Sequence, residues 1–291
     1  TIKPHREVTS VETSSEALAL SIGEKARVDL PYMEQLTGKT QDELVKDLHG
    51  VIFKVPNSEP VSYAAADEYL SGNVRTKLII AQAAAKDDPE LAVNVEALKQ
   101  VIPKDLSAAE ISVRLGTTWI PQEDIQQFVM ELLTPSQYAR GKIKVRYTEF
   151  NGDWFIEDKS SDFDNVKANS TYGTKRASAY RIIEDTLNLR DVRIFDYVYD
   201  EHGNKKAVFN AKETTAAQAK QEAIKQAFAD WIWKDPERRN RLVRYYNDTF
   251  NCIRPREYDG SHITFGGISP EITLRPHQVN AIAHILYGGN T

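Results

Sequence analysis

The densest group of chemically capable side chains is a cluster of cations and aromatic rings between residues 233 and 246. It contains Lys234, Arg238, Arg239, Arg241 and Arg244, with Trp233, Tyr245 and Tyr246 beside them. On a helix that begins near Pro236, the side chains of Arg238, Arg241 and Tyr245 share one stripe. Guanidinium groups along such a stripe can follow a phosphate backbone, and exposed rings can stack on unpaired bases. With Arg254 and Arg256 beyond it, the cluster predicts a nucleic-acid contact.

The same cluster has a purely structural interpretation, in which the rings are core residues and the arginines pair with nearby acids. The rings concerned are Trp231, Tyr245 and Phe250, and the acids are Asp230, Asp235 and Glu237. The net charge of −5 excludes a uniformly basic chain but not a local basic surface. Residues 1–134 hold 13 basic and 21 acidic side chains, whereas the remaining 157 hold 24 and 21. This asymmetry indicates different partners for the two parts.

Patterns for catalysis or metal binding are incomplete. Gly38-Lys39-Thr40 resembles the end of a phosphate-binding loop, but Met33 stands where the full loop needs its first glycine. The six histidines form no His-Glu-x-x-His pair, and Cys252 is the one cysteine, which excludes a zinc site built of cysteines. No two prolines are adjacent, so the Asx-Pro-Pro-aromatic motif of amino-methyltransferases is missing. We expect no catalytic residue, no metal site and no cofactor in this chain itself.

The elements that would position the basic cluster begin with three short helices. Ser14 or Ser15 can cap the first helix, and Asp29 can cap the second. Thr40 with Glu43 three residues later is a capping box that opens the third helix. Strand-like residues 51–55 follow, and this order of elements is typical of a winged-helix unit.

We expect the first winged-helix-like unit over residues 1–60 and a second within 61–160. A helical segment over 65–85 separates them. The helices expected in the second unit cover 93–102, 107–116 and 121–133, and its hairpin wing joins 142–150 to 153–157 around Asn151-Gly152. The third helices of both units carry acidic side chains that phosphate would repel, which favours protein contacts for them. These acidic residues are Asp42, Glu43 and Asp47 in the first unit, and Glu123 and Asp124 in the second.

Residues 161–260 read as an α+β unit that contains the basic helix, and 261–291 as a lead-in to a further domain. Within the first of these we expect a polar loop over 160–169, a helix over 174–187, a hairpin of 192–199 with 207–210 that turns at 201–204, and helices over 216–233 and 236–250. A last helix covers 274–287. The predicted fold class is α+β and helix-rich, with tandem winged-helix-like units followed by a hairpin-plus-helices domain.

Length and hydropathy place the chain among globular proteins. Its 291 residues, 41% of them hydrophobic, suffice for two or three domains with their own cores. No apolar run approaches the roughly 20 residues that cross a bilayer, and the first residues carry no signal-peptide pattern. We expect a fragment of a longer cytoplasmic protein that makes no membrane contact.

One segment near the end of the sequence reads Ile272-Thr273-Leu274-Arg275-Pro276-His277-Gln278-Val279-Asn280-Ala281-Ile282. It resembles the stretch just before the nucleotide-binding loop of superfamily 2 helicases. Further familiar stretches are Tyr246-Asn247 with Phe250-Asn251, residues 256–262 and residues 69–74. Together they resemble the region before the motor in very large proteins of bacterial mobile elements and phages. Those proteins join an adenine-specific DNA methyltransferase to a Swi/Snf-like helicase.

This resemblance implies roles that the chain could not fill alone. In the helicase family the glutamine that matches Gln278 bonds the adenine base, so Gln278 would be a cofactor-binding residue of a full-length parent only. ATP with Mg²⁺ and S-adenosylmethionine are expected for that parent, an ATP-dependent helicase and methyltransferase. The phosphate loop and the acidic Mg²⁺ motif would lie beyond Thr291, so we expect no ATP hydrolysis by this chain.

The favoured interpretation is a non-catalytic accessory fragment that orients the motor and adds DNA contacts through residues 234–256. The alternative is a protein-interaction scaffold that docks the neighbouring methyltransferase and helicase domains without touching nucleic acid. A third hypothesis, an independent hydrolase that uses scattered Asp, Glu and His residues, would need converging carboxylates in a deep pocket.

Overall fold

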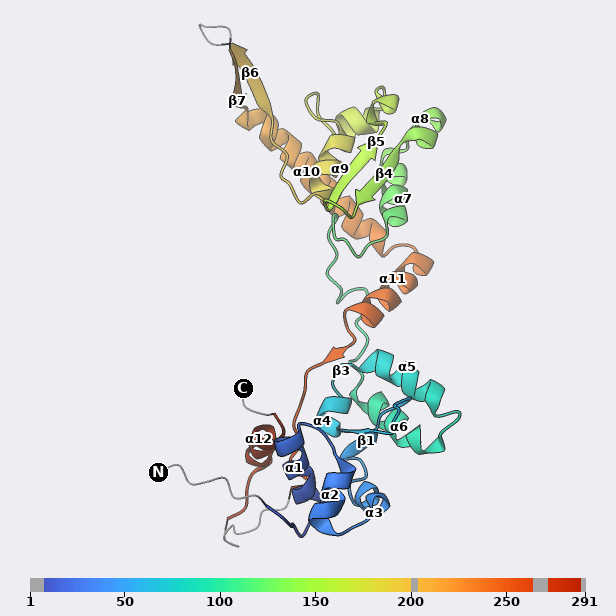
Figure 1. The fold of residues 1–291 in the computed structure, drawn as a ribbon. Coiled ribbons are helices and arrows are strands. Elements are labelled where there is room, and N and C mark those ends of the chain that lie inside the picture. Colours follow the sequence, from blue (N-terminus) through green and yellow to red (C-terminus); the bar gives the residue numbers. More distant parts are fainter. Residues whose placement is uncertain (1–7, 200–203, 264–271, 289–291) are drawn as a thin grey trace. The chain divides into compact units, whose positions relative to one another are not determined.

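The computed structural model describes residues 8–199, 204–263 and 272–288. The chain divides into two compact units, shown in Figure 1 and treated separately below. Unit 1 contains residues 1–105 and 246–291, and unit 2 contains residues 106–245. Unit 2 is therefore inserted into the sequence of unit 1. The predicted domain boundaries after residues 60, 160 and 260 stay a prediction.

Unit 1 opens with the three predicted helices and a two-stranded wing. These elements are α1 (Ser14–Lys25), α2 (Leu30–Thr37), α3 (Gln41–Asp47), β1 (Ile52–Lys54) and β2 (Tyr63–Ala65). Asp29 caps α2 and Thr40 with Glu43 forms the capping box of α3, as predicted. The prediction for α1 was wrong by one residue, because Thr13 and Glu16 form a reciprocal box that satisfies two amides.

The winged-helix core forms where the apolar faces of these helices meet the wing. Leu18, Met33 and Leu44 are buried at its centre. Strand β1 pairs antiparallel with β2, with Ile52 opposite Ala65. Val28, in the connection before α2, adds a bridge to Tyr63. The small sheet thus closes the core that the three helices leave open.

The rest of unit 1 combines residues from both ends of its sequence. Its elements are α4 (Ala66–Tyr69), β3 (Gly72–Asn73), α5 (Val74–Ala84), the 3-10 turn η1 (Pro89–Leu91), α6 (Ala92–Val101), β8 (Ile253–Arg254) and α12 (Pro276–Tyr287). Strand β3 pairs with β8, and α12 packs against α1 (Figure 1). The late segment after residue 246 is therefore an integral part of the winged-helix unit.

Unit 2 is built around one large core. Its elements are α7 (Gln122–Leu133), α8 (Gln137–Lys142), β4 (Lys144–Thr148), β5 (Asp153–Glu157), η2 (Lys159–Asp162), η3 (Lys167–Thr171), α9 (Ala179–Leu187), β6 (Phe195–Tyr199), β7 (Lys205–Phe209), α10 (Ala211–Ile232) and the first part of α11 (Pro236–Thr249). The predicted amphipathic stripe of α7 is buried in this core, with Phe128 edge-on to Phe228 of α10. Hairpins β4–β5 and β6–β7 pair as predicted.

Three local predictions for unit 2 were wrong. No helix forms over 107–116, although Ser107 and Glu110 make the expected side-chain contact. One capped turn does not sustain a short helix, and Leu115 is instead drawn into the core. Helix α9 begins at Ala179 rather than at Thr174, whose hydroxyl closes a turn with Ala177.

The third error concerns residues 160–169, predicted as a polar loop. Part of this stretch forms the helical turns η2 and η3. Asp162 is buried there and accepts the Tyr180 hydroxyl at 2.7 Å, a long-range contact that no local pattern signals. Of the predicted hairpin turn over 201–204, residues 201–203 lie outside the described residues. The fold is α+β and helix-rich, as predicted.

Candidate functional site

The C-terminal helix α12, which carries Gln278, is fixed onto the winged-helix unit. The Ser15 hydroxyl in α1 donates to the backbone carbonyl of His262 at 3.1 Å. The His262 ring nitrogen Nε2 lies 2.8 Å from the Tyr287 hydroxyl, and the two rings are nearly parallel. The Gly260 amide donates to Asn280 Oδ1 at 3.0 Å. These contacts tie the second turn and the last residue of α12 to the segment before it, and tie that segment to α1.

A glycine is required for this close approach. A Cβ added to Gly260 would lie 2.4 Å from the carbonyl oxygen of Val279, well inside van der Waals contact. Glycine, which has no Cβ, lets the chain pass directly across α12. The sequence pattern around 256–262 is therefore explained in part by packing.

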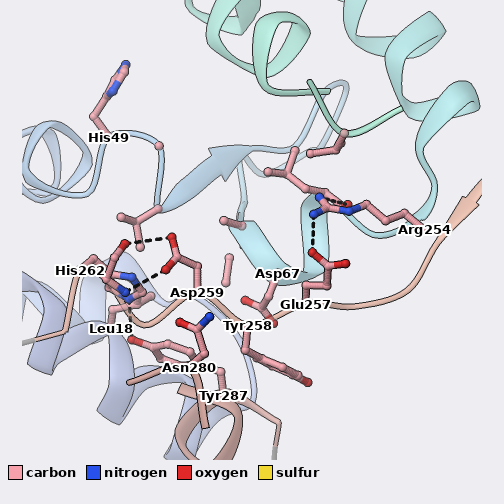
Figure 2. Close-up of a pocket in the computed structure, with 17 residues that line it drawn as sticks. Leu18, His49, Asp67, Arg254, Glu257, Tyr258, Asp259, His262, Asn280 and Tyr287 are labelled. Carbon is pink, nitrogen blue, oxygen red and sulfur yellow. Dashed lines mark hydrogen bonds and ion pairs between the residues drawn. The ribbon is translucent and has the colours of Figure 1, made fainter. Parts of the chain in front are cut away.

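A cavity of about 450 Å³ lies beside this docking contact, within unit 1. Figure 2 shows His262, Asp259, Asn280 and Tyr287 gathered on one side of it. Arg254 and Glu257 form an ion pair at 2.6 Å on the other side. Burial lowers the pKa of His262, and the neighbouring Asp259 only partly offsets this effect. Burial also raises the pKa of Tyr287 to about 12, so its hydroxyl stays protonated at neutral pH.

Gln278 takes a structural role at the start of α12. Its side-chain oxygen accepts the backbone amide of Arg275, the N-cap residue of α12, at 2.9 Å. The side chain is exposed. Its expected contact with an adenine base stays a prediction.

The two segments through which the chain leaves and re-enters unit 1 are fastened to each other. Arg75 of α5 donates from Nε to the Asn251 carbonyl and from Nη2 to the Pro103 carbonyl, both at 3.0 Å. Its Nη2 also lies 2.5 Å from Asp105. Asn251 in turn donates to the Lys104 carbonyl at 2.8 Å. This clamp holds the base of the insertion closed within unit 1.

Of the predicted nucleic-acid-binding residues, Arg238 is the most deeply buried. Its side chain donates to the carbonyls of Trp231 and Ile232 at the end of α10, and its guanidinium stacks 3.5 Å from the Trp231 ring. Only 7% of the residue is exposed. Arg238 therefore terminates α10 and joins it to α11.

Arg241 is held by a buried carboxylate. Its Nη2 donates to both oxygens of Asp124 in α7, at 2.7 and 2.9 Å. The Asp124 side chain is 6% exposed, whereas that of Arg241 is 52% exposed. Arg241 therefore pairs with an acid from α7, and not with the acids nearby in sequence that the structural interpretation named.

Two further predicted residues, Arg254 and Arg256, lie in unit 1 and are engaged in ion pairs. Arg254 pairs with Glu257, and Arg256 Nε lies 2.5 Å from Asp67. The structure places Arg256 Cζ 5.4 Å from the centre of the Tyr258 ring. These two arginines therefore belong to unit 1, whereas the other members of the cluster belong to unit 2.

The remaining members, Lys234, Arg239 and Arg244, have exposed side chains. Among the residues that the structure describes, the side chains of Lys234 and Arg239 make no hydrogen bond or ion pair. The cluster is therefore split: some cations are built into the fold, and others face solvent.

Polar residues of α7 that could have read bases are used within unit 2. Gln126 donates to the Ile143 carbonyl and accepts the Val145 amide, and Gln122 accepts the Tyr147 amide. In unit 1, Asp47 of α3 bonds Ser14 and Lys39. Polar side chains of both predicted third helices, α3 and α7, are thus engaged in contacts within their own unit.

Sequence reasoning missed the clamp and the docking contact. Arg75, Asn251 and His262 join segments more than a hundred residues apart, so no spacing pattern could reveal them.

Within the described part of the chain, no group of three or more His, Cys, Asp or Glu side chains could hold a metal ion. Over the same residues, no helix has the length and apolar character needed to span a bilayer.

Comparisons with known families match both units. Residues 10–63 match a family described as "Probable helicase, winged helix domain". Residues 114–252 match a domain of unknown function (DUF8437), which covers most of unit 2. No curated protein and no solved structure matches the chain. The first match supports a helicase-associated winged-helix region at residues 10–63.

Proposed function

We propose that this chain is a non-catalytic accessory region that holds the lead-in to a helicase motor and adds DNA contacts. The observation that carries the proposal is the docking of α12 on α1 of the helicase-associated winged helix. By resemblance, α12 is the segment that precedes the nucleotide-binding loop. A lead-in helix that is packed against the unit transmits orientation better than a free one, because packing supplies the stability that an isolated helix of this length lacks.

The finer parts of the proposal concern the parent protein. We propose a methyltransferase–helicase of a bacterial mobile element or phage, which would bind ATP with Mg²⁺ and S-adenosylmethionine elsewhere and act in the cytoplasm. The coding sequence after Thr291 tests this assignment directly. A glycine-rich Gly-Lys-Thr loop within about ten residues supports it, and an unrelated sequence there contradicts it.

DNA contact is proposed for the exposed cations of unit 2, chiefly Lys234 and Arg239. Each phosphate that a cation neutralises steepens the salt dependence of binding by about 0.9 in the log–log slope. Fluorescence anisotropy of labelled duplex and single strands, measured over rising salt, should show a shallower slope for Lys234→Ala and Arg239→Ala. Lys99→Ala, at an exposed lysine of unit 1, is the matched control and should leave the slope unchanged. Equal slopes for all three variants would remove the DNA contact.

One observation favours the second candidate, a protein-docking scaffold. Hairpin β6–β7 exposes a row of large apolar side chains, which in soluble proteins often marks an interaction surface. These side chains are Phe195, Tyr197, Val198, Tyr199, Val208 and Phe209. A pulldown of this chain with the methyltransferase and helicase parts of a parent separates the candidates, since only the scaffold predicts capture that survives high salt but fails when Tyr197 and Tyr199 become serine.

A further inference from the structure

Unit 2 contains a second cavity of about 540 Å³ that aromatic rings line. Trp119 and Tyr245 form one ring pair, with centroids 6.5 Å apart and planes 24° from parallel. Tyr147 and Trp154 form another, with centroids 4.9 Å apart. A space of this size accommodates a nucleoside or a short peptide segment. Such a concentration of rings predicts an occupant with a flat or apolar surface.

The ring pairs differ in exposure. Tyr245 is 47% exposed, whereas Trp154 belongs to the core of the unit. The Trp154 indole N–H is buried and makes no hydrogen bond among the described residues. A buried donor without a partner is costly, and because the indole nitrogen is closed to solvent it belongs to the wall of the cavity rather than to its accessible surface. The cavity therefore has a rigid inner wall and an accessible outer ring.

Arg241 lies at the same cavity, where the buried carboxylate of Asp124 pairs with its guanidinium. Asp124 binds only the Nη2 atom of Arg241, and the Nε and Nη1 donors make no hydrogen bond within the described chain. The buried carboxylate thus holds the guanidinium in place while leaving donors for a ligand. Such a fixed, planar donor group suits a phosphate oxygen and disfavours a cationic ligand.

Two further polar side chains line the cavity and could meet the edge of a base. The Gln122 carbonyl oxygen is used by the Tyr147 amide at 3.1 Å, which leaves its amide N–H groups. Glu149 is exposed and contributes a carboxylate acceptor. Amide and carboxylate groups are the side chains that pair with base edges.

We propose that this aromatic cavity binds an unpaired nucleobase of DNA, with the flanking phosphate on Arg241. The base stacks on Tyr245 and Trp119, and Gln122 and Glu149 contact its edge. This inference rests on the proposed DNA contact and specifies it, since it makes unpaired rather than duplex nucleotides the preferred ligand. Aromatic grooves also bind proline-rich peptides, but the anchored arginine and the basic start of α11 favour a phosphate-bearing ligand.

The test compares three labelled DNA duplexes with the full chain. One is fully paired, one carries a single unpaired 2-aminopurine nucleotide, and one carries an abasic nucleotide at the same place. Stacking predicts about tenfold tighter binding of the unpaired base than of the abasic site, with a change of 2-aminopurine fluorescence on binding. The abasic duplex removes the base without changing the protein, so the result does not depend on any variant folding.

Variants then locate the contact. Tyr245→Ala and Trp119→Ala should abolish the preference for the unpaired base, whereas Tyr245→Phe should keep it, since a phenyl ring also stacks. Phe163→Ala, at an exposed ring outside the cavity, is the matched control and should bind the three duplexes as the unsubstituted chain does.

The outcomes separate this inference from the function on which it rests. Equal affinity for the unpaired and abasic duplexes, with salt-dependent binding retained, overturns the base pocket and leaves the DNA contact standing. No affinity for any duplex overturns both. A proline-rich peptide could instead change the tryptophan fluorescence of the unsubstituted chain but not that of Tyr245→Ala. This result, together with no preference for the unpaired base, assigns the cavity to a protein ligand and overturns the proposal.

Discussion

Individual arginines of the basic segment divide between the fold and the solvent. Arg238 donates hydrogen bonds to the two last carbonyls of α10 and stacks on the Trp231 ring, whereas the adjacent Arg239 is exposed to solvent. Neighbouring residues on a helix point in directions about 100° apart, so such a split within one pair is natural. It explains why composition alone overestimates the number of cations free to bind phosphate.

A pair of alanine substitutions tests this division. Arg238→Ala should lower the free energy of unfolding by about 2 kcal/mol, because two hydrogen bonds and a cation–π contact are lost. Arg239→Ala should change it by less than about 0.5 kcal/mol, as expected at a surface position. Urea denaturation measures both. Equal destabilisation by the two variants would contradict the assignment of Arg238 to the fold.

At the scale of elements, the docking of α12 should depend on the protonation of His262, which contacts Tyr287 of that helix. Burial lowers the pKa of His262, so the folded chain binds a proton less readily than the unfolded chain. The docking contact is therefore fully present above the unfolded pKa of about 6.5, and its contribution is lost as pH falls through the lower, folded pKa.

Measuring stability against pH for the unsubstituted chain and for His262→Gln gives the size of this contribution. Between about pH 8 and about pH 5 the unsubstituted chain should lose more unfolding free energy than His262→Gln, whose side chain does not titrate. His277→Gln, at an exposed position of α12, should respond to acid as the unsubstituted chain does. Parallel pH profiles for the unsubstituted chain and His262→Gln would show that His262 does not couple docking to protonation.

The crossing of Gly260 over α12 gives a second prediction at this scale. Gly260→Ala places a methyl group against the Val279 carbonyl and should cost about 1–3 kcal/mol of unfolding free energy. Gly23→Ala, in open space on α1, should instead stabilise the helix by about 0.5–1 kcal/mol. Thermal unfolding followed by circular dichroism checks both signs. A neutral Gly260→Ala would mean that α12 is not packed as described.

For the whole molecule, the main finding is the insertion of unit 2 into a unit made from both ends of the sequence. Arg75 closes the base of that insertion, with only 12% of its side chain exposed. Arg75→Ala should cost about 2–3 kcal/mol of unfolding free energy, because the lost bonds involve a largely buried charge. Lys99→Ala, which breaks an exposed pair with Glu96, should cost less than about 1 kcal/mol. Similar losses in urea denaturation would contradict the clamp.

Local signals predicted much of the architecture and none of this insertion. Asp29 and the Thr40–Glu43 box identified helix starts because the groups that form a cap lie within a few residues. The similar Ser107–Glu110 pair failed, because burial of Leu115 decided that segment. The pairing of β3 with β8 and the pair Arg241–Asp124 join distant residues, so only the fold could reveal them.

The candidate site was predictable to the same extent. The basic and aromatic residues were found from composition and spacing, but their surroundings were not. Tyr245 and Arg241 line a cavity together with Trp119 and Trp154, which are about 90 to 125 residues earlier in the sequence, so only the tertiary structure could bring them together.

Amide hydrogen exchange across α12 tests the central claim, that this helix is held by the winged-helix unit, most directly. An isolated helix of this length is marginal in water, so protection of its amides must come from packing. If α12 is held in this way, residues 276–287 exchange nearly as slowly as those of α1 and lose protection in Gly260→Ala. Exchange at the rate of an unstructured peptide, while α1 stays protected, would contradict it.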